Sequence, residues 1–487
     1  MGASVLLLGL PILGSIAIIF APAGNDGRGP LWTAIAAAGV VLATALIMAL
    51  RIESGAGVQY VTNIAWITEI GVQFHIGLDG LTALMTLLTA LLSVAALVAV
   101  PGTMGKVNRP FLVWFLLLEA TVMGVFLARD WFLFYLFWEL ALIPMFFLIG
   151  VWGGQRRARA AYSFFLYTLA GSVVMLIGLM AAYLEATAQG IAHGFEMSVI
   201  AEAMQSAPAS LQVFVFICVF AGMAVKVPVV PLHGWLPMAH VEAPVPASIM
   251  LSGILLKMGG YGMIRLSEMV PGAFQMFGSA VLVLGLVTII YGAVLAFRQD
   301  DLKAMIAYSS VSHMGFVVLG IGSMTEIGVR GAAVQMFSHG LVTAALFALV
   351  GVVYAQTHSR SLILSSGIGR GSPRFAILMT LALLASMGLP GLSGFVGEFQ
   401  VLMGGYERWG QSVAIAGIGI LLVTAYSLRV FRRLILAPSQ REGVVLRDLG
   451  ALDLAGIVPL AILMVLLGLF PSPIANLAAG VLPAVQP

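Results

Sequence analysis

Long apolar runs separated by short polar connections fill almost the whole chain. A membrane-spanning helix needs about 20 predominantly apolar residues, and fourteen runs have roughly that length. The pattern therefore predicts an all-α polytopic membrane protein, with residues 1–487 forming a single transmembrane domain. The predicted spans lie near residues 4–21, 31–50, 78–100, 110–128, 131–150, 162–185, 211–236, 244–266, 273–297, 303–321, 329–356, 374–406, 411–436 and 451–470.

The basic residues of the loops predict an orientation in the membrane. Sixteen of the 23 Lys and Arg residues fall in the odd-numbered loops, and five fall in the even-numbered loops. Cytoplasmic loops of membrane proteins carry an excess of Lys and Arg. The odd-numbered loops are therefore predicted to face the cytoplasm, with both termini on the opposite side.

Composition narrows the class of function. Hydrophobic residues make up 61% of the chain and charged residues 9%, with a net charge of +3, whereas a soluble domain carries about 25% charged residues. No basic stripe indicates nucleic-acid binding. The sequence shows no phosphate-binding loop and no dinucleotide fingerprint. Cys218 is the single cysteine, so an iron–sulfur cluster held by this chain is not expected, and any associated electron transfer takes place elsewhere.

Two of the predicted spans are interrupted. Helix 7 contains the run VPVVPLHGWLP at residues 227–237, and helix 12 contains LPGLSG at residues 389–394. An ionisable residue lies beside each interruption, Lys226 in the first helix and Glu398 in the second. Paired broken helices of this kind are typical of transporter repeats built around a site at the membrane midplane.

Glu139 and Lys226 are predicted to interact. Each lies in mid-span without an oppositely charged residue on its own helix. A lysine at that depth costs roughly 2.5–3.5 kcal/mol on insertion scales, so it needs a partner, a hydrated cavity or a function. Each residue favours the charged form of the other, so a change in their distance releases or captures a proton. The alternative is an ion pair that only fixes helix packing.

Lys257 is a second buried lysine, within helix 8. It follows Ser252 and Gly253 and precedes Gly259 and Gly260, small residues that leave space for water or for a close helix. The alternative is a lysine that reaches back to the membrane surface, but its predicted span extends about equally far on both sides.

Further titratable residues extend the candidate site. Glu398 is a candidate terminal proton acceptor, and the alternative is a carboxylate that caps the second half of helix 12. His313 and His339 have hydroxyl neighbours in consecutive helices, which suits a hydrated proton wire because imidazole titrates near neutral pH. His233 lies within the helix 7 break. The alternative for each histidine is a satisfied interior side chain, and no ligand spacing supports a zinc site.

Two acidic residues are secondary candidates. Glu119 lies within helix 4, and Asp79 lies at the start of helix 3. Asp79 has a plain structural alternative as the N-cap of its helix.

Four motifs resemble the antiporter-like membrane subunits of respiratory complex I. They are FWELALIPMFFLIGVWGG at residues 137–154, the stretch AVKVPVVPLHGWLPMAHVEAPVPASIMLSGILLKMGGYG, SSVSHMG at 309–315 and GLPGLSGFVGEF at 388–399. The resemblance implies a fourteen-helix subunit with two inverted five-helix repeats, at residues 110–266 and 273–436. It also implies that Glu139, Lys226 and Lys257 carry proton translocation.

The resemblance also implies a subtype and a setting. The glutamate at position 398, in helix 12, resembles the M-type subunit, because the N-type subunit usually has lysine at this position. The L-type subunit differs in having a long lateral helix. The expected partners are L-type and N-type chains and small membrane subunits of a bacterial inner-membrane complex, with both termini periplasmic. NADH, FMN, iron–sulfur clusters and quinone are expected in those partner subunits. The alternatives are an N-type chain, a Na⁺/H⁺ antiporter subunit of the Mrp type and a structural spacer.

Overall fold

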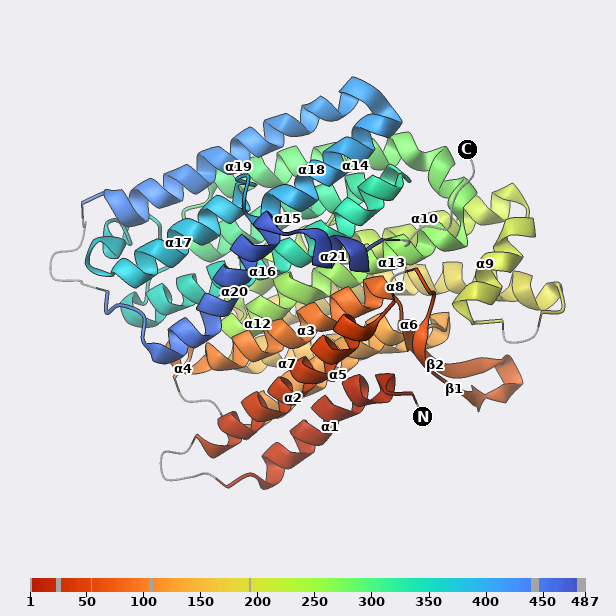
Figure 1. The fold of residues 1–487 in the computed structure, drawn as a ribbon, viewed down its shortest axis with the longest axis horizontal. Coiled ribbons are helices and arrows are strands. Elements are labelled where there is room, and N and C mark those ends of the chain that lie inside the picture. Colours follow the sequence, from red (N-terminus) through yellow and green to blue (C-terminus); the bar gives the residue numbers. More distant parts are fainter. Residues whose placement is uncertain are drawn as a thin grey trace.

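The computed structural model describes residues 2–22, 28–53, 55–105, 108–191, 194–438 and 446–479. Its helices run side by side in one bundle, with a β-hairpin and α9 (Met197–Ser206) at one end and α4 (Val100–Thr103) at the other (Figure 1). We call these ends the hairpin side and the arginine side. The hairpin side carries the even-numbered loops, and the arginine side carries the odd-numbered loops.

The first half of the bundle follows the predicted order of helices. Its remaining elements are α1 (Ser4–Phe20), α2 (Gly29–Arg51), β1 (Gln59–Ile67), η1 (Thr68–Ile70), β2 (Val72–Leu78), α3 (Gly80–Val98), α5 (Arg109–Leu127), α6 (Trp131–Leu140), α7 (Leu142–Trp152), α8 (Arg157–Ala188), α10 (Ala209–Lys226) and α11 (Trp235–Glu242).

The second half contains the longest buried helices. Its elements are α12 (Val245–Met250), η2 (Leu251–Leu255), α13 (Leu256–Met269), α14 (Pro271–Arg298), α15 (Leu302–Gly322), α16 (Glu326–Thr357), η3 (Ile368–Gly371), α17 (Pro373–Ser386), α18 (Ser393–Trp409), η4 (Gly410–Ile415), α19 (Ala416–Phe431), η5 (Arg432–Leu436), α20 (Ala451–Leu469) and α21 (Ser472–Leu477).

Within the described ranges, twelve helical segments are long and apolar enough to cross a membrane. Two shorter apolar helices, α1 and α17, match the predicted first span and the first part of the predicted twelfth span. The stretch that contains α18 and α19 counts as one continuous segment of 44 residues, although two spans were predicted there. The multi-pass all-α fold is therefore confirmed, whereas the count of fourteen spans and the inverted repeats remain predictions.

Both predicted helix breaks are present. The first break separates α10 from α11, and Pro228, with φ of 31°, lies within it. The second separates α17 from α18, where Gly388 and Gly391 have φ of 69° and 91°. Proline removes a backbone donor and glycine permits positive φ, so the residues that predicted the interruptions also explain them.

The β-hairpin was not predicted. Strands β1 and β2 pair antiparallel, with Asn63 opposite His75. Several apolar side chains of β1 are exposed, including Ile64 and Trp66, so its sequence lacks the clear alternation that marks a strand with one buried face. The hairpin distinguishes the two sides of the bundle. The predicted positions of both termini stay untested, because Met1 and residues 480–487 lie outside the described residues, as do the loop cations Lys106 and Arg441.

The centre of the bundle is formed by the span of α12, η2 and α13 together with α16, whose most apolar windows are completely buried. Gly259 brings α13 against α10, because a Cβ added there would lie 2.6 Å from Val227 Cγ2 and 2.9 Å from the Met223 carbonyl oxygen. The π-helical turn η2 lies immediately before Lys257. Such turns disturb the regular pattern of backbone hydrogen bonds and are frequent at functional sites.

Candidate functional site

Lys257 lies at the centre of the site with no exposed surface. Its Nζ donates a hydrogen bond of 2.6 Å to the Ser252 carbonyl oxygen, which belongs to the π-helical turn η2. It also lies 2.6 Å from Nδ1 of His339 on α16. The lysine is therefore held inside the bundle, and the alternative in which it reaches the membrane surface is wrong.

His313 and Glu398 form a second close pair. His313 Nδ1 on α15 lies 3.0 Å from Glu398 Oε1 on α18, and Gln335 Nε2 donates to the same oxygen over 3.3 Å. The Ser386 hydroxyl lies 3.4 Å from His313 Nε2. Glu398 makes no cap for α18, so its alternative role as a capping carboxylate is not supported.

A small cavity connects the two pairs. It is lined by His313, Gln335, His339 and Glu398, among others, and has a volume of about 10 Å³. That volume is close to the minimum for one water molecule, and the site has several polar partners for it. The two histidine rings are 5.5 Å apart between centroids, and His339 Nε2 has no hydrogen-bond partner in the described part of the chain. One bridging water would connect the lysine pair with the glutamate pair.

Lys226 is the last residue of α10 and is 1% exposed. Its Nζ has no hydrogen-bond partner among the described residues and lies 5.3 Å from the ring centroid of Trp138 and 5.7 Å from that of Phe164. A cation is attracted to an aromatic face at these distances. The aromatic rings therefore replace part of the missing solvation of the amine.

Glu139 lies on α6, half-buried and within electrostatic range of Lys226. The two side chains form no ion pair within 4.0 Å, so the structure shows a separated pair instead of a direct contact. The hydroxyl groups of Tyr135 and Ser172 lie near the carboxylate. Glu139 Oε1 is buried and has no hydrogen-bond partner among the residues that the structure describes. At this spacing the charges of Glu139 and Lys226 still interact electrostatically. Neither side chain is fixed by a direct contact with the other, so each can form a contact with another group.

Sequence analysis missed a polar path on the arginine side. His240 on α11 is completely buried, stacks on Phe347 with 4.9 Å between centroids, and has no hydrogen-bond partner at either ring nitrogen within the described residues. It lies within electrostatic range of Lys257 and Lys303. It therefore places a titratable side chain between the site and the arginine side.

Lys303 at the start of α15 continues that path. It is 4% exposed, and its Nζ donates to the Ala243 carbonyl oxygen over 2.6 Å. Arg360 donates to the Val241 carbonyl oxygen over 2.7 Å. Both cations satisfy carbonyl groups at the end of α11, where a helix lacks internal donors and carries partial negative charge. Lys303 is one of the sixteen cations counted in the odd-numbered loops, and its burial depends on tertiary packing that the sequence does not display.

An open polar cavity of about 600 Å³ lies beside these cations on the arginine side. Glu242, at the end of α11, lines it and accepts hydrogen bonds from the Arg156 amide over 2.9 Å and from Arg156 Nε over 3.4 Å. Asp301 pairs there with Arg360 at 2.9 Å. The cavity therefore places acidic groups at the arginine-side end of this path.

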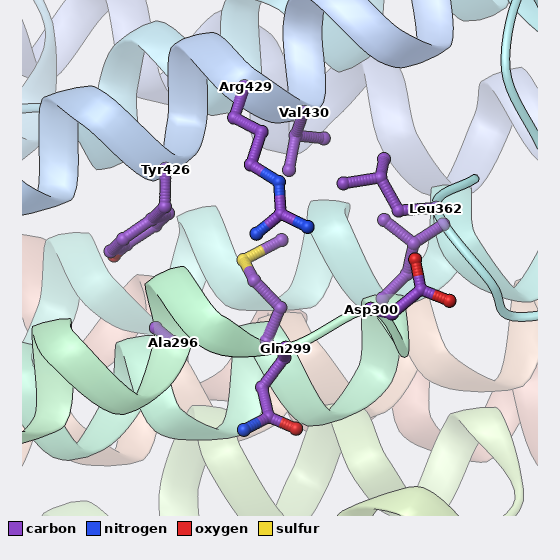
Figure 2. A pocket seen from close by; sticks show the side chains of 9 residues that line it. Ala296, Gln299, Asp300, Leu362, Tyr426, Arg429 and Val430 are labelled. Atoms are coloured by element: carbon purple, nitrogen blue, oxygen red, sulfur yellow. The ribbon is translucent and has the colours of Figure 1, made fainter.

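The wall of the site on α19 is closed. Tyr426 donates to Ser309 Oγ over 2.9 Å. Figure 2 shows Tyr426 and Arg429 lining a recess above Asp300 and Gln299. The recess leaves a volume of about 0 Å³ for water, so side chains fill this flank.

The secondary candidates lie away from the central pairs. His233 lies in the helix 7 break near Tyr291 and Tyr308, with ring centroids 5.6 and 6.4 Å away. Glu119 on α5 is completely buried, and neither carboxylate oxygen has a hydrogen-bond partner in the described structure.

Asp79 accepts from the Thr82 amide over 2.8 Å, which confirms its alternative role as a helix cap. It also pairs with Arg129 at 3.0 Å and with Arg265. Burial acts to raise the pKa of Asp79, but the two guanidinium groups outweigh it and hold the pKa well below its usual range.

Comparisons with known proteins relate the chain to one membrane-protein family. Residues 128–424 match the family described as NADH:quinone oxidoreductase/Mrp antiporter, transmembrane. The chain is 39% identical over 426 residues to NADH-quinone oxidoreductase subunit M of Rickettsia conorii, covering 87% of this chain and 85% of that protein.

The fold is also found in solved structures. A chain of respiratory complex I from Thermus thermophilus with bound NADH superposes with a TM-score of 0.88 at 29% identity, covering 98% of both chains. A chain of the Mrp complex from Dietzia sp. superposes with a TM-score of 0.85 at 22% identity, covering 98% of this chain and 96% of that chain.

Proposed function

Because this chain belongs to the NADH:quinone oxidoreductase/Mrp antiporter transmembrane family, we propose that it is the M-type proton-translocating subunit of a complex I in a bacterial inner membrane. The curated relative at 39% identity is a subunit M, and Glu398 occupies the helix 12 position where the N-type subunit usually has lysine. The N-type alternative is therefore the weaker one.

One observation carries the proposal. Buried titratable side chains succeed one another from Lys257 through His339 and His313 to Glu398, with contacts of 2.6 and 3.0 Å at the two ends and a water-sized cavity in the middle. A structural spacer would have no need for charges that are costly inside a membrane. A chain of donors and acceptors at such distances is what proton transfer requires.

The mechanism begins at the separated pair. Redox events in partner subunits change the distance between Glu139 and Lys226, and loss of the carboxylate partner favours the neutral amine. The released proton passes to Lys257, whose helix packs directly on α10 at Gly259. His339, water and His313 carry it to Glu398, which discharges it on the hairpin side. His240 and Lys303 supply the next proton from the arginine-side cavity.

Partner subunits provide the redox chemistry in this proposal. They hold NADH, FMN, iron–sulfur clusters and quinone, while this chain moves protons only. L-type and N-type chains and small membrane subunits cover its exposed apolar faces, and both termini are periplasmic. The half-buried position of Glu139 supports such a partner, because a carboxylate facing hydrocarbon is costly.

The test is replacement of Lys226 or Glu139 by alanine in the assembled complex. We expect quinone reduction coupled to proton pumping to fall strongly in both variants, with normal assembly. Arg51→Gln is the matched control, because Arg51 is exposed at the end of α2. Wild-type pumping in both alanine variants would show that these residues do not have the proposed roles.

An Mrp-type Na⁺/H⁺ antiporter subunit is the second candidate. The family description covers both kinds of protein, and the similarity to the Dietzia chain at 22% identity shows the fold alone. Na⁺ or K⁺ flux by the chain reconstituted without redox partners would favour this candidate, and strictly redox-dependent proton movement would exclude it.

A further inference from the structure

A second polar cavity lies on the hairpin side, apart from the path described above. Its volume is about 240 Å³, enough for several waters at about 30 Å³ each. Its polar and charged lining residues are His75, Asp79, Arg129, Trp131, Glu196, Ser198, Arg265 and Glu268. Burial, and to a smaller extent Arg129, lowers the pKa of His75, while Glu196 acts to raise it.

Two buried side chains on its wall each have a nitrogen without a hydrogen-bond partner in the described part of the chain. Among the described residues, Arg265 Nε and Trp131 Nε1 lack a hydrogen bond, and His75 Nδ1 has only a long contact of 3.6 Å with Glu196 Oε1. Arg265 is 5% exposed and Trp131 is 1% exposed. Buried donors are almost always satisfied by protein or by ordered water, so these atoms indicate that water fills the cavity. We call this cavity the hairpin-side vestibule.

A stripe of hydroxyl groups on α3 leads from the vestibule into the bundle. It consists of Thr82, Thr86, Thr89 and Ser93, each at most 1% exposed. At about 100° per residue these positions fall within an arc of about 60° on one helix face. Arg129 Nη2, on the vestibule wall, donates to Thr82 Oγ1 over 2.9 Å. The stripe therefore begins at the vestibule.

The stripe ends at Glu119. The Ser93 hydroxyl lies beside the Glu119 carboxylate, although neither carboxylate oxygen has a partner with hydrogen-bond geometry. Thr86 and Thr89 donate to carbonyl oxygens of their own helix, over 2.8 Å each. Their oxygen lone pairs remain available to accept from water. An unpartnered buried carboxylate at the end of such a row needs water or a proton to be tolerated.

We propose that the hairpin-side vestibule and the α3 hydroxyl stripe form a hydrated branch that gives Glu119 access to protons from the hairpin side. The branch is separate from the path between Lys257 and Glu398. The claim that it is hydrated stands on its own, whereas the claim that it carries protons rests on the proposed function. Glu119 would then exchange protons with the hairpin side while Lys303 and His240 serve the arginine side.

Cysteine labelling tests the hydration. The chain has a single cysteine, so Cys218→Ser in the assembled complex gives a cysteine-free background for this subunit. Thr86→Cys and Thr89→Cys report on the stripe, and Leu84→Cys and Leu88→Cys are matched controls, because both leucines are completely buried and lie on the other side of α3. The probe is 2-aminoethyl methanethiosulfonate added from either side of membrane vesicles. Quinone reductase activity reports on folding.

We expect the stripe cysteines to react from the hairpin side at least about tenfold faster than the controls, because thiol reactivity requires access to water. Equal rates at stripe and control positions, or reaction only from the arginine side, would overturn the branch.

Glu119→Gln tests whether the branch carries protons. We expect a lower ratio of protons pumped to quinone reduced in this variant and an unchanged ratio in Thr121→Val, a control on the same helix. Faster labelling of the stripe together with normal pumping in Glu119→Gln would overturn the proton role. If Glu119→Gln pumps normally but Lys226→Ala loses pumping, the proposed function stands and only the proton role of the branch fails. A failure of the branch can therefore be distinguished from a failure of the proposed function.

Discussion

Lys257 Nζ lies 2.6 Å from His339 Nδ1, and the same amine donates to the Ser252 carbonyl oxygen. A charged lysine can only donate, so Nδ1 accepts and the ring proton of a neutral His339 resides on Nε2. That nitrogen has no partner in the described structure, and the residue lines the cavity shared with His313. A proton received at Nδ1 therefore leaves from the opposite side of the ring.

His339→Gln should separate transfer from folding. Glutamine can still accept a hydrogen bond from Lys257, but it cannot exchange protons. We expect assembly near the wild-type level and a proton-transfer step slowed roughly 10²–10⁴-fold, the usual contribution of a positioned acid or base. Proton pumping driven by NADH oxidation in proteoliposomes measures this. Normal pumping would remove His339 from the path.

Glu398 should depend on its charge more than on its shape. Glu398→Gln keeps a partner for Gln335 but removes the titratable carboxyl group that faces His313 at 3.0 Å. We expect pumping to be lost in Glu398→Gln and partly retained in Glu398→Asp. Equal activity of the two variants would contradict the role of a terminal acceptor. Pumping rates at matched complex content provide the measurement.

Asp79 should contribute to stability because one carboxylate joins three segments. Arg129 lies just before α6, which carries Glu139, and Arg265 lies on α13, which carries Lys257. Asp79→Ala leaves two buried guanidinium groups without this partner, a change worth about 3–5 kcal/mol of unfolding free energy for a broken buried pair. We expect a marked fall in the amount of assembled complex.

The control for Asp79 is Glu326→Gln. The pair between Glu326 and Arg330 is 3.8 Å long, with the glutamate side chain 70% exposed, and exposed pairs are worth about 0–1 kcal/mol. Assembly should stay normal in this variant. Similar losses in the Asp79 and Glu326 variants would argue against the buried ion cluster.

Gly259→Ala should disturb the contact between the two lysine helices. The added Cβ would lie 2.9 Å from the Met223 carbonyl oxygen, a backbone atom that cannot move away alone. We expect a loss of about 1–3 kcal/mol in unfolding free energy. Gly39→Ala on α2 is the control, because a Cβ there has nothing within 4 Å. Thermal unfolding in detergent compares the two variants. Equal unfolding midpoints in Gly259→Ala and Gly39→Ala would contradict the close contact between α13 and α10.

Much of the site could be predicted because charge inside an apolar run is conspicuous. Lys226, Lys257 and Glu398 stand out in this way, and prolines and glycines mark the helix breaks beside two of them. The close pairs between Lys257 and His339, and between His313 and Glu398, could not be predicted. They join helices that are distant in sequence, and their distances depend on packing.

The features that were missed depend on tertiary structure in the same way. Lys303 follows two aspartates and has the sequence of a loop residue, yet α11 and α15 pack so that its amine is buried. His240 has no neighbouring hydroxyl residue, unlike His339, so the criterion used for the other histidines does not select it. The π-helical turn before Lys257 leaves no mark in sequence periodicity, because it changes the backbone over only five residues.

The central claim is that protons pass through the buried amine of Lys257. The most direct measurement is the number of protons pumped per NADH oxidised by the assembled complex in proteoliposomes, compared between wild type and Lys257→Met. The methionine fills a similar volume without a titratable group. We expect Lys257→Met to assemble normally and to pump fewer protons per NADH oxidised than the wild type. An unchanged number of protons per NADH would contradict the central claim.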